Sequence, residues 1–394
     1  MRVLIALASA AHQISGVQRH AINVARCLLT RSEITAIDLI GAPWQQKFLR
    51  DFMLGSDARL QVHSAPIGGN AVSRNAWYYF QLPKLAAELR ADIVHLAYPV
   101  PVDGRAFHCP TVVTLHDLYP YDVPRNFGFP KVIFNRLVLE HCLRAADAIA
   151  CVSSSTLSRL ERFAPSLICG RADVIRNCVG SQPQVSAKPL QNWKGQPFLL
   201  CVAQHRSNKN ILFLLRVFAR LLSTSGLAPE TRLVIVGIEG PETNAIVRYI
   251  TKAGLAERIF LLSGISEAEL QWCYRNCQLL VAPSVTEGFG LPVAEALLAG
   301  CDVVCSDIPA FHEAGGDHCR YIPLDSAAEQ AFVEAITAGV RAPSRKAVVL
   351  PHLSPQVIAE KYLRLYRSLL ATPSAAKAPR PVAAVQSPEK GPIA

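Results

Sequence analysis

Short apolar runs alternate, along the first half of the chain, with longer segments in which apolar residues recur every three or four positions. The short runs predict buried strands over residues 2–8, 37–40, 93–96, 111–115, 148–152 and 173–175. The longer segments predict helices over residues 16–29, 83–90 and 132–146. Regular alternation of strand and helix indicates a parallel, doubly wound sheet with helices on both faces.

A second series of the same kind begins after residues 181–197, which are polar, hold three prolines and predict a linker. It predicts strands over residues 198–203, 232–237, 259–262, 278–282 and 302–306. It predicts helices over residues 212–222, 244–252, 267–276, 292–300 and 327–340. The expected class is therefore α/β, with two Rossmann-like doubly wound domains, over residues 1–185 and 186–353, facing a central cleft.

The C-terminal part of the chain differs from both domains. The apolar spacing in residues 354–371 predicts a last amphipathic helix. Residues 372–394 are rich in Pro, Ala, Lys and Ser, which predicts a disordered tail.

Composition narrows the function classes. The 394 residues carry a net charge of +10, but the charge is dispersed, with no basic cluster interleaved with aromatics, so no nucleic-acid partner is expected. A phosphorylated substrate or a lipid headgroup fits the charge better. The twelve cysteines lack metal-site spacing and indicate free thiols in a reducing cytoplasm. No run of eighteen apolar residues occurs, so no transmembrane helix is expected.

The most informative motif lies at residues 283–300, between a predicted strand and a predicted helix. Seven residues separate its two carboxylates, Glu287 and Glu295, which are acceptors suited to sugar hydroxyls. The glycines of the turn let a ligand approach the backbone, and the helix N-terminus favours a negative group. The amides expected to face that ligand are those of Gly288, Phe289, Gly290 and Leu291.

This segment resembles the signature of the retaining glycosyltransferases of family 4, Pro-Ser-x-x-Glu-Gly-Phe-Gly-Leu-Pro-x-x-Glu-Ala-x-Ala-x-Gly. The chain departs from it at one position, because Leu298 stands where the signature has its last alanine, and the alanine follows at 299. The resemblance implies the GT-B fold, in which the terminal helix, here residues 354–371, crosses back to the first domain. It also implies that Glu295 accepts from the donor ribose and that Glu287 holds donor-sugar hydroxyls as a catalytic residue.

Weaker resemblances supply further site candidates. The segment Thr114-Leu115-His116-Asp117 resembles the family's Thr-x-His-Asp, which implies a catalytic place for His116 beside the donor. Asp117 either orients this loop or touches substrate. Gly16 stands where the family usually has a glycine pair near the donor phosphates.

The loop after residues 198–203 ends in Lys209-Asn210, which matches the family's diphosphate-binding lysine. The usual glycine and the usual arginine or threonine are replaced by Ala203 and Gln204, and Arg206 is a candidate to compensate. Glu313 resembles the glutamate of a Glu-x-x-Gly segment and is expected to be structural.

Together these features predict a retaining glycosyltransferase that uses a nucleotide-diphosphate sugar and neither a metal nor another cofactor. Arg74–Trp77 resembles the mannosyltransferase-like branch, which favours GDP-mannose as donor and a glycan or lipid-linked acceptor in cell-surface polysaccharide synthesis. The aromatic run 77–80 forms either a core stripe, which is favoured for at least two of its four residues, or a patch that faces the acceptor or a membrane. Together with Arg136 and Arg144 of helix 132–146, such a patch suits a cytoplasmic protein attached peripherally to a membrane. Two alternatives stay open: a sugar-nucleotide epimerase, and a non-catalytic scaffold that binds a sugar nucleotide.

Overall fold

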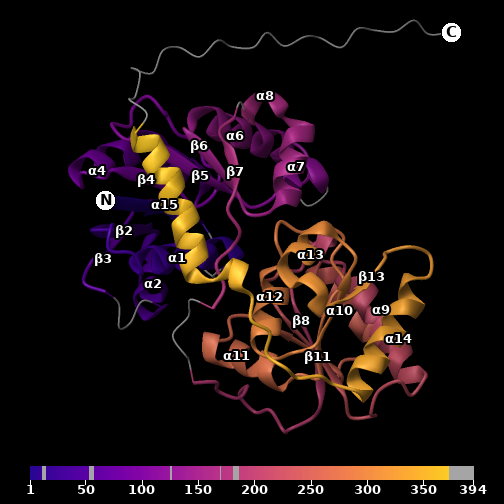
Figure 1. Ribbon diagram of the computed structural model, residues 1–394. Helices are drawn as coiled ribbons and strands as arrows, with labels where there is room; N and C mark the ends of the chain where they lie inside the picture. Colours follow the sequence, from indigo (N-terminus) through magenta and orange to yellow (C-terminus); the bar gives the residue numbers. More distant parts are fainter. Residues whose placement is uncertain (11–14, 53–56, 125–126, 169, 181–185, 372–394) are drawn as a thin grey trace, which may run out of the picture.

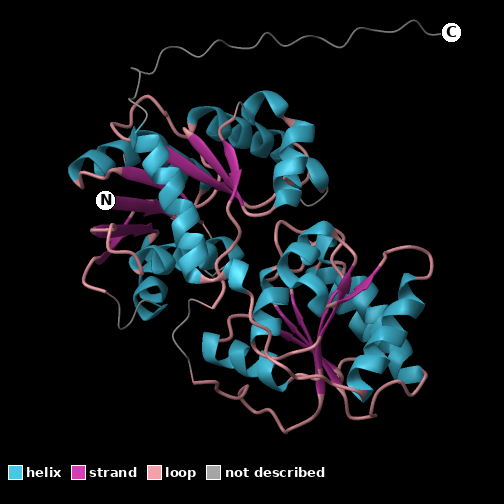
Figure 2. Ribbon diagram, in the orientation of Figure 1, coloured by secondary structure: helices cyan, strands magenta, loops and turns pink. Residues whose placement is uncertain are grey.

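The computed structural model describes residues 1–10, 15–52, 57–124, 127–168, 170–180 and 186–371. These residues form two α/β domains, each a sheet enclosed by helices (Figures 1 and 2). The predicted tail 372–394, and residues 181–185 of the predicted linker, lie outside the described residues.

The first domain is built on a parallel sheet of seven strands in the order β3-β2-β1-β4-β5-β6-β7. Chain order reverses at β1, as a doubly wound sheet requires. The strands are β1 (Arg2–Ala6), β2 (Ala36–Gly41), β3 (Leu60–Ser64), β4 (Ile93–Leu96), β5 (Thr111–Leu115), β6 (Ala148–Cys151) and β7 (Ala172–Val174).

Helices cover both faces of this sheet. The helices are α1 (Gly16–Leu29), α2 (Gln46–Phe52), α3 (Ala71–Phe80), α4 (Leu82–Glu88), α5 (Tyr119–Asp122), α6 (Lys131–Ala145), α7 (Ser154–Phe163) and α8 (Pro165–Ile168). One core cluster joins the sheet to α1, and the other joins it to α3, α4 and α6. Of the aromatic run 77–80, Trp77 and Tyr78 are buried in that second cluster, while Phe80 is exposed.

The second domain has a parallel sheet of six strands in the order β10-β9-β8-β11-β12-β13. The strands are β8 (Phe198–Val202), β9 (Arg232–Val236), β10 (Ile259–Leu262), β11 (Leu279–Ala282), β12 (Val303–Ser306) and β13 (Arg320–Ile322). Its helices are α9 (Ile211–Ser223), α10 (Thr243–Lys252), α11 (Glu267–Asn276), α12 (Leu291–Leu298), α13 (Pro309–Gly315) and α14 (Ala328–Arg341). Two doubly wound parallel sheets confirm the predicted fold class.

The last helix, α15 (Pro355–Ala371), leaves the second domain and lies across the first (yellow in Figure 1). It packs along α1, and its Ile358, Tyr362 and Tyr366 are fully buried in the core that β1 and α1 also form. Burying these three side chains ties α15 to the first domain.

Some predicted boundaries were wrong. The strand predicted over 2–8 ends at Ala6, although Leu7 and Ala8 remain buried. The helix predicted from Pro292 begins one residue earlier, at Leu291. Helix 132–146 was expected to be amphipathic, but in α6 Ile133, Phe134 and Leu137 are exposed while Leu139, Cys142 and Leu143 are buried. Apolar side chains therefore emerge on more than one side of α6.

Candidate functional site

The two motif glycines lie where the loop between β11 and α12 touches neighbouring chain. A Cβ atom at Gly288 would stand 1.8 Å from the carbonyl oxygen of His116 in the first domain. Gly290 has a φ of +99°, and a Cβ there would lie 2.7 Å from the ring of Phe311. Glycine is required at both positions by protein packing. The sequence indicated that these glycines let a ligand approach, but it did not reveal this packing requirement.

The first domain also binds the carbonyl side of this loop. Ser153, the N-cap residue of α7, donates its hydroxyl to the carbonyl oxygen of Gly288 at 2.5 Å, and Thr156 donates to the same oxygen at 3.2 Å. The backbone amides of residues 288–291, in contrast, donate to no hydrogen-bond acceptor within the described part of the chain. The four amides of Gly288, Phe289, Gly290 and Leu291 therefore remain available to a ligand at the N-terminus of α12.

Lys209 and Glu287 form an ion pair at the centre of the site. The ammonium nitrogen lies 2.6 Å from each carboxylate oxygen of Glu287, and Ser284 Oγ donates to Oε1 at 2.8 Å. The side chains of Lys209 and Glu287 are 17% and 12% exposed. Asn208 fixes the approach of the lysine, since its side chain donates to the carbonyl of Thr286. The structure thus brings the expected phosphate-binding cation against the expected catalytic carboxylate.

The loop after β5 adds a second carboxyl group to this cluster. Burial raises the pKa of Asp117 to about 6; the positive charges of Arg206 and Lys209 oppose the rise, and Glu287 adds to it. Asp117 Oδ1 accepts from the amide of Tyr119, so this residue also orients its own loop. Arg206 begins the turn that carries Lys209, whose amide donates to the carbonyl of Arg206 at 3.0 Å, and the charge of Arg206 opposes the rise in the pKa of both Asp117 and Tyr119.

His116 lies half-buried at the carboxyl end of β5. Its Nε2 donates to the carbonyl of Ala97 at 2.9 Å, and its ring meets the edge of His20 at a centroid distance of 4.9 Å. Burial lowers the pKa of His116 to about 4, so the imidazole is neutral at neutral pH. Since Nε2 carries the proton, Nδ1 can accept a hydrogen bond from a sugar hydroxyl but cannot donate one to a phosphate.

Glu295, in the second turn of α12, meets side chains from both domains. Tyr274 Oη donates to Oε2 at 2.9 Å, and Arg19 Nη1 lies 3.3 Å from Oε1. Burial raises the pKa of this carboxyl group, while the guanidinium of Arg19 opposes the rise. Gly16 begins α1 three residues before Arg19, is exposed, and has open space where a Cβ would stand.

The sequence did not identify Arg19 or Tyr274 as site residues, because neither belongs to the motif at residues 283–300.

The sequence did single out Glu313, which was expected to be structural. Its carboxylate accepts from the amides of Ser154 and Ser155 at 2.9 Å each and pairs with Arg176 at 3.1 Å. This contact fastens α13 to the N-terminus of α7 in the other domain.

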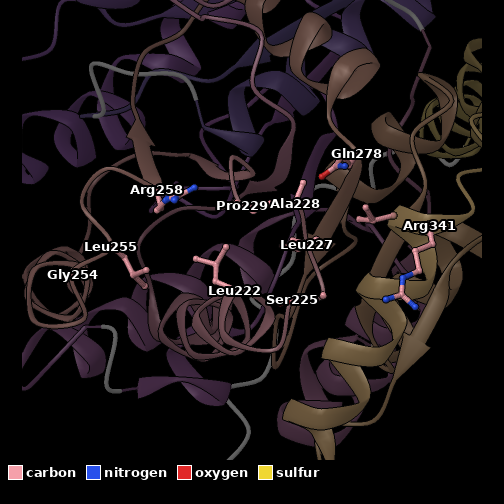
Figure 3. A pocket seen from close by; sticks show the side chains of 12 residues that line it. Leu222, Ser225, Leu227, Ala228, Pro229, Gly254, Leu255, Arg258, Gln278 and Arg341 are labelled. Atoms are coloured by element: carbon pink, nitrogen blue, oxygen red, sulfur yellow. The ribbon is translucent and has the colours of Figure 1, made fainter.

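A separate hollow lies on the opposite edge of the second sheet. Its volume is about 650 Å³, and Leu227, Arg258 and Gln278, which line it, precede β9, β10 and β11 (Figure 3). It therefore lies at the amino ends of the strands, whereas doubly wound sheets bind ligands at the carboxyl ends.

In the described ranges no three His, Cys, Asp or Glu side chains gather as metal ligands.

Two family models match adjacent parts of the chain. The model for glycosyltransferase family 4 matches residues 14–181, and the model for group 1 glycosyl transferases matches residues 185–347. Together they span both domains and include every candidate site residue.

Curated relatives with sequence similarity include bacterial mannosyltransferases. The O-antigen chain mannosyltransferase RfbU of Salmonella typhimurium is 25% identical over 224 residues, which cover 57% of this chain and 59% of the relative. The O-antigen chain mannosyltransferase B of Escherichia coli is 26% identical, and the chain spans 55% of its length. The GDP-mannose:cellobiosyl-diphosphopolyprenol alpha-mannosyltransferase of Xanthomonas oryzae is 24% identical, covering 93% of this chain and 97% of the relative.

Solved structures with the same fold include WaaG, described as a glycosyltransferase involved in lipopolysaccharide biosynthesis. Its TM-score is 0.64 at 16% identity, covering 94% of this chain and 97% of WaaG. Sucrose-phosphate synthase from Thermosynechococcus elongatus has a TM-score of 0.68 at 17% identity, covering 94% and 99%. These likenesses concern the fold alone.

Proposed function

The chain belongs to glycosyltransferase family 4 and has the GT-B fold, and from this premise we propose that it transfers a hexose from a nucleotide-diphosphate sugar with retention of configuration. The observation that carries the proposal is the gathering of Lys209, Glu287, Glu295 and His116 at the carboxyl ends of β5, β8 and β11, between the two domains. Ligands of open α/β sheets bind at this edge.

Each group suits one part of such a donor. The ammonium of Lys209, the guanidinium of Arg206 and the free amides of residues 288–291 converge on one region and would stabilise the charge of a departing diphosphate. Glu287 pairs with Lys209 only until a diphosphate competes for the lysine, after which its carboxylate can accept from hydroxyls of the donor sugar. His116, neutral and with Nδ1 as acceptor, complements that role.

Positioning and electrostatics are the contributions that these residues can make, and both act without a metal ion. We therefore propose metal-independent transfer with no cofactor beside the nucleotide sugar itself. The bond between the anomeric carbon and the diphosphate oxygen breaks, the acceptor oxygen forms the new glycosidic bond to that carbon, and the proton of the acceptor hydroxyl passes to the departing diphosphate or to water.

GDP-mannose is the donor that we propose. The relatives support it, since RfbU and mannosyltransferase B are O-antigen chain mannosyltransferases, and the Xanthomonas oryzae relative is named for GDP-mannose and a diphosphopolyprenol acceptor. By the same reasoning the acceptor is a growing surface glycan or a lipid-linked saccharide.

An equimolar competition assay tests the donor. The protein is incubated with GDP-mannose, UDP-glucose and UDP-N-acetylglucosamine, and each nucleoside diphosphate released is quantified. We expect GDP to dominate. Release of UDP without GDP would contradict the donor assignment while leaving the enzyme class in place. If all three donors bind and none is consumed, the chain is instead a sugar-nucleotide-binding scaffold, and conversion of the sugar without release of nucleoside diphosphate would indicate an epimerase.

A membrane surface is the second partner that we propose. Four large apolar side chains stand exposed at the start of α6: Phe129 at 84%, Leu137 at 61%, Phe134 at 52% and Ile133 at 48%. Basic side chains flank them at Lys131, Arg136 and Arg144. Apolar residues rimmed by basic ones suit the interface of an anionic bilayer.

This α6 surface adjoins the donor site. Arg136 donates to the carbonyl of Pro120 at 2.8 Å and lies over the ring of Tyr121, two residues beyond Tyr119, whose hydroxyl reaches within 3.5 Å of Glu287. A lipid-linked acceptor held at α6 would thus enter beside the reacting groups.

No helix in the described part of the chain has the length and apolar character to cross a bilayer. The described cysteines are in no disulfide and all but Cys319 are buried, and on that ground we propose a cytoplasmic location.

A further inference from the structure

Arg19, in the first turn of α1, reaches across to the second domain and faces two carboxylates at once. Its Nη2 lies 2.8 Å from Glu267 Oε2, and its Nη1 lies 3.3 Å from Glu295 Oε1. The side chains of Arg19, Glu267 and Glu295 are 18%, 14% and 11% exposed. Because Glu267 begins α11 and Glu295 lies in α12, one guanidinium joins the first domain to two helices of the second.

The contacts of Glu295 leave hydrogen-bond acceptor positions on its carboxylate for the ribose hydroxyls of a nucleotide. Tyr274 Oη donates to Oε2, and Arg19 faces Oε1. An ionised carboxylate has about two acceptor positions on each oxygen, so one remains on each after these contacts. A ribose presents two neighbouring hydroxyl donors. Arg19 and Tyr274 thus orient the carboxylate, and the two acceptor positions that remain can serve the two hydroxyls.

Arg19 also controls the charge of this carboxylate. Burial and the nearby Glu267 both raise the pKa of Glu295, whereas the guanidinium of Arg19 and the hydroxyl of Tyr274 lower it. The same carboxylates outweigh the effect of burial on Arg19 and raise its pKa, so the guanidinium stays charged. Without Arg19, a buried carboxylate beside a second carboxylate would take up a proton at a higher pH.

We propose that Arg19 is a positioning residue for the donor: from the first domain it fixes the orientation and the negative charge of Glu295, and thereby couples recognition of the ribose to the docking of the two domains. This inference rests on the proposed function, because it takes Glu295 as the acceptor of the ribose hydroxyls. Arg19 itself need not touch the nucleotide.

The test compares affinities for GDP and 2′-deoxy-GDP in the wild-type protein and in Arg19→Gln, measured by calorimetry on the full chain. If Glu295 reads the ribose, the wild type prefers GDP by about tenfold, the value of one charge-assisted hydrogen bond. Arg19→Gln should lower this preference to about twofold or less. Arg176→Gln is the matched control: it also removes an ion pair between the domains, at 3.1 Å to Glu313, but contacts no site residue, and it should keep the wild-type preference.

A pH series supplies a readout that a purely structural role would not move. In Arg19→Gln the loss of GDP affinity on acidification should begin at a higher pH than in the wild type, and Arg19→Lys, which restores the charge, should return it. If Arg19→Gln weakens GDP and 2′-deoxy-GDP equally, or keeps the preference, the inference is overturned. Wild-type protein that binds no nucleoside diphosphate would instead contradict the proposed function. Should Arg19→Gln not fold, Glu267→Gln, which removes the other anchor of the guanidinium, is measured in the affinity comparison: it should lower the preference for GDP, and an unchanged preference would overturn the inference.

Discussion

The ammonium of Lys209 lies 2.6 Å from both carboxylate oxygens of Glu287, across the 78 residues that separate them in the chain. Neither side chain is more than about a fifth exposed, since the values are 17% and 12%. The pair keeps two buried charges neutral as a unit. On the proposed function, a diphosphate that enters the site would compete with Glu287 for the lysine, and the ion pair would be the resting state of the site.

The first prediction concerns Lys209. In Lys209→Ala the affinity for a nucleoside diphosphate should fall by roughly tenfold to a hundredfold, because a charge-assisted hydrogen bond contributes about 1.5–3 kcal/mol. The unpaired carboxylate of Glu287 would add repulsion to the loss. Affinity for the corresponding nucleoside should change little. Calorimetric titration with both ligands measures the difference, with the exposed Lys194→Ala as control. Equal losses for the two ligands would show that Lys209 does not contact the phosphates.

The second prediction concerns metal ions. Addition of EDTA should leave the rate of transfer unchanged, because the charges around Glu287 that face the donor are those of side chains and backbone amides. Rates are measured before and after chelation and again after addition of Mg²⁺ or Mn²⁺. A loss of activity that either ion restores would contradict metal-independent transfer.

The third prediction concerns acid stability. Burial, with a smaller contribution from His116, lowers the pKa of His95 to about 3. The unfolded chain, in which a histidine has a pKa near 6.5, therefore binds one more proton than the folded chain between these values. The stability that His95 contributes is present at neutral pH and is lost as the pH falls below about 6.5, by about 1.4 kcal/mol per pH unit.

Urea unfolding between pH 7 and pH 5 measures this effect. In His95→Gln the free energy of unfolding should fall less steeply with acidification than in the wild type, whatever its value at pH 7. His318→Gln, at an exposed position, serves as the control. Parallel curves for the wild type and His95→Gln would show that the folded protein protonates His95 like the unfolded chain.

The fourth prediction concerns the exposed α6 surface. Vesicles that contain an anionic phospholipid should bind the protein more strongly than neutral vesicles, and the binding should weaken with added salt. The double variant Phe134→Ser, Leu137→Ser should bind at least about tenfold more weakly, since burying each side chain contributes on the order of 1.5 kcal/mol. The control is Val247→Ser, Val349→Ser, which removes two exposed side chains of the second domain. Equal binding of the two double variants would place the contact elsewhere.

The sequence predicted the buried strands well, because the apolar runs of β4 and β5 end at clear breaks, and both strands have the predicted bounds. It missed β3, since an edge strand is half exposed and its apolar residues do not form a run. It also missed α13 and β13, which are too short for a helical or strand period to show.

The site was predictable only in part, for a physical reason. Glu287, Glu295 and Lys209 stood out because a local motif carries them. That Lys209 pairs with Glu287, or that Arg19 reaches Glu295 over 276 residues of sequence, depends on how two domains meet. Gly288 illustrates the same limit: its motif suggested a ligand, whereas the backbone of His116 in the other domain excludes any larger residue.

The measurement that tests the account most directly is the release of GDP and the transfer of mannose from GDP-mannose by the wild-type protein and by Glu287→Ala, each in the presence of a polyprenyl-diphosphate-linked oligosaccharide. The account predicts transfer by the wild type and a rate at least about a hundredfold lower in Glu287→Ala, with a cooperative thermal unfolding transition retained, because Glu287 faces the site rather than a packed core. Turnover by a folded Glu287→Ala at close to the wild-type rate would remove Glu287 from the reaction and contradict the central claim.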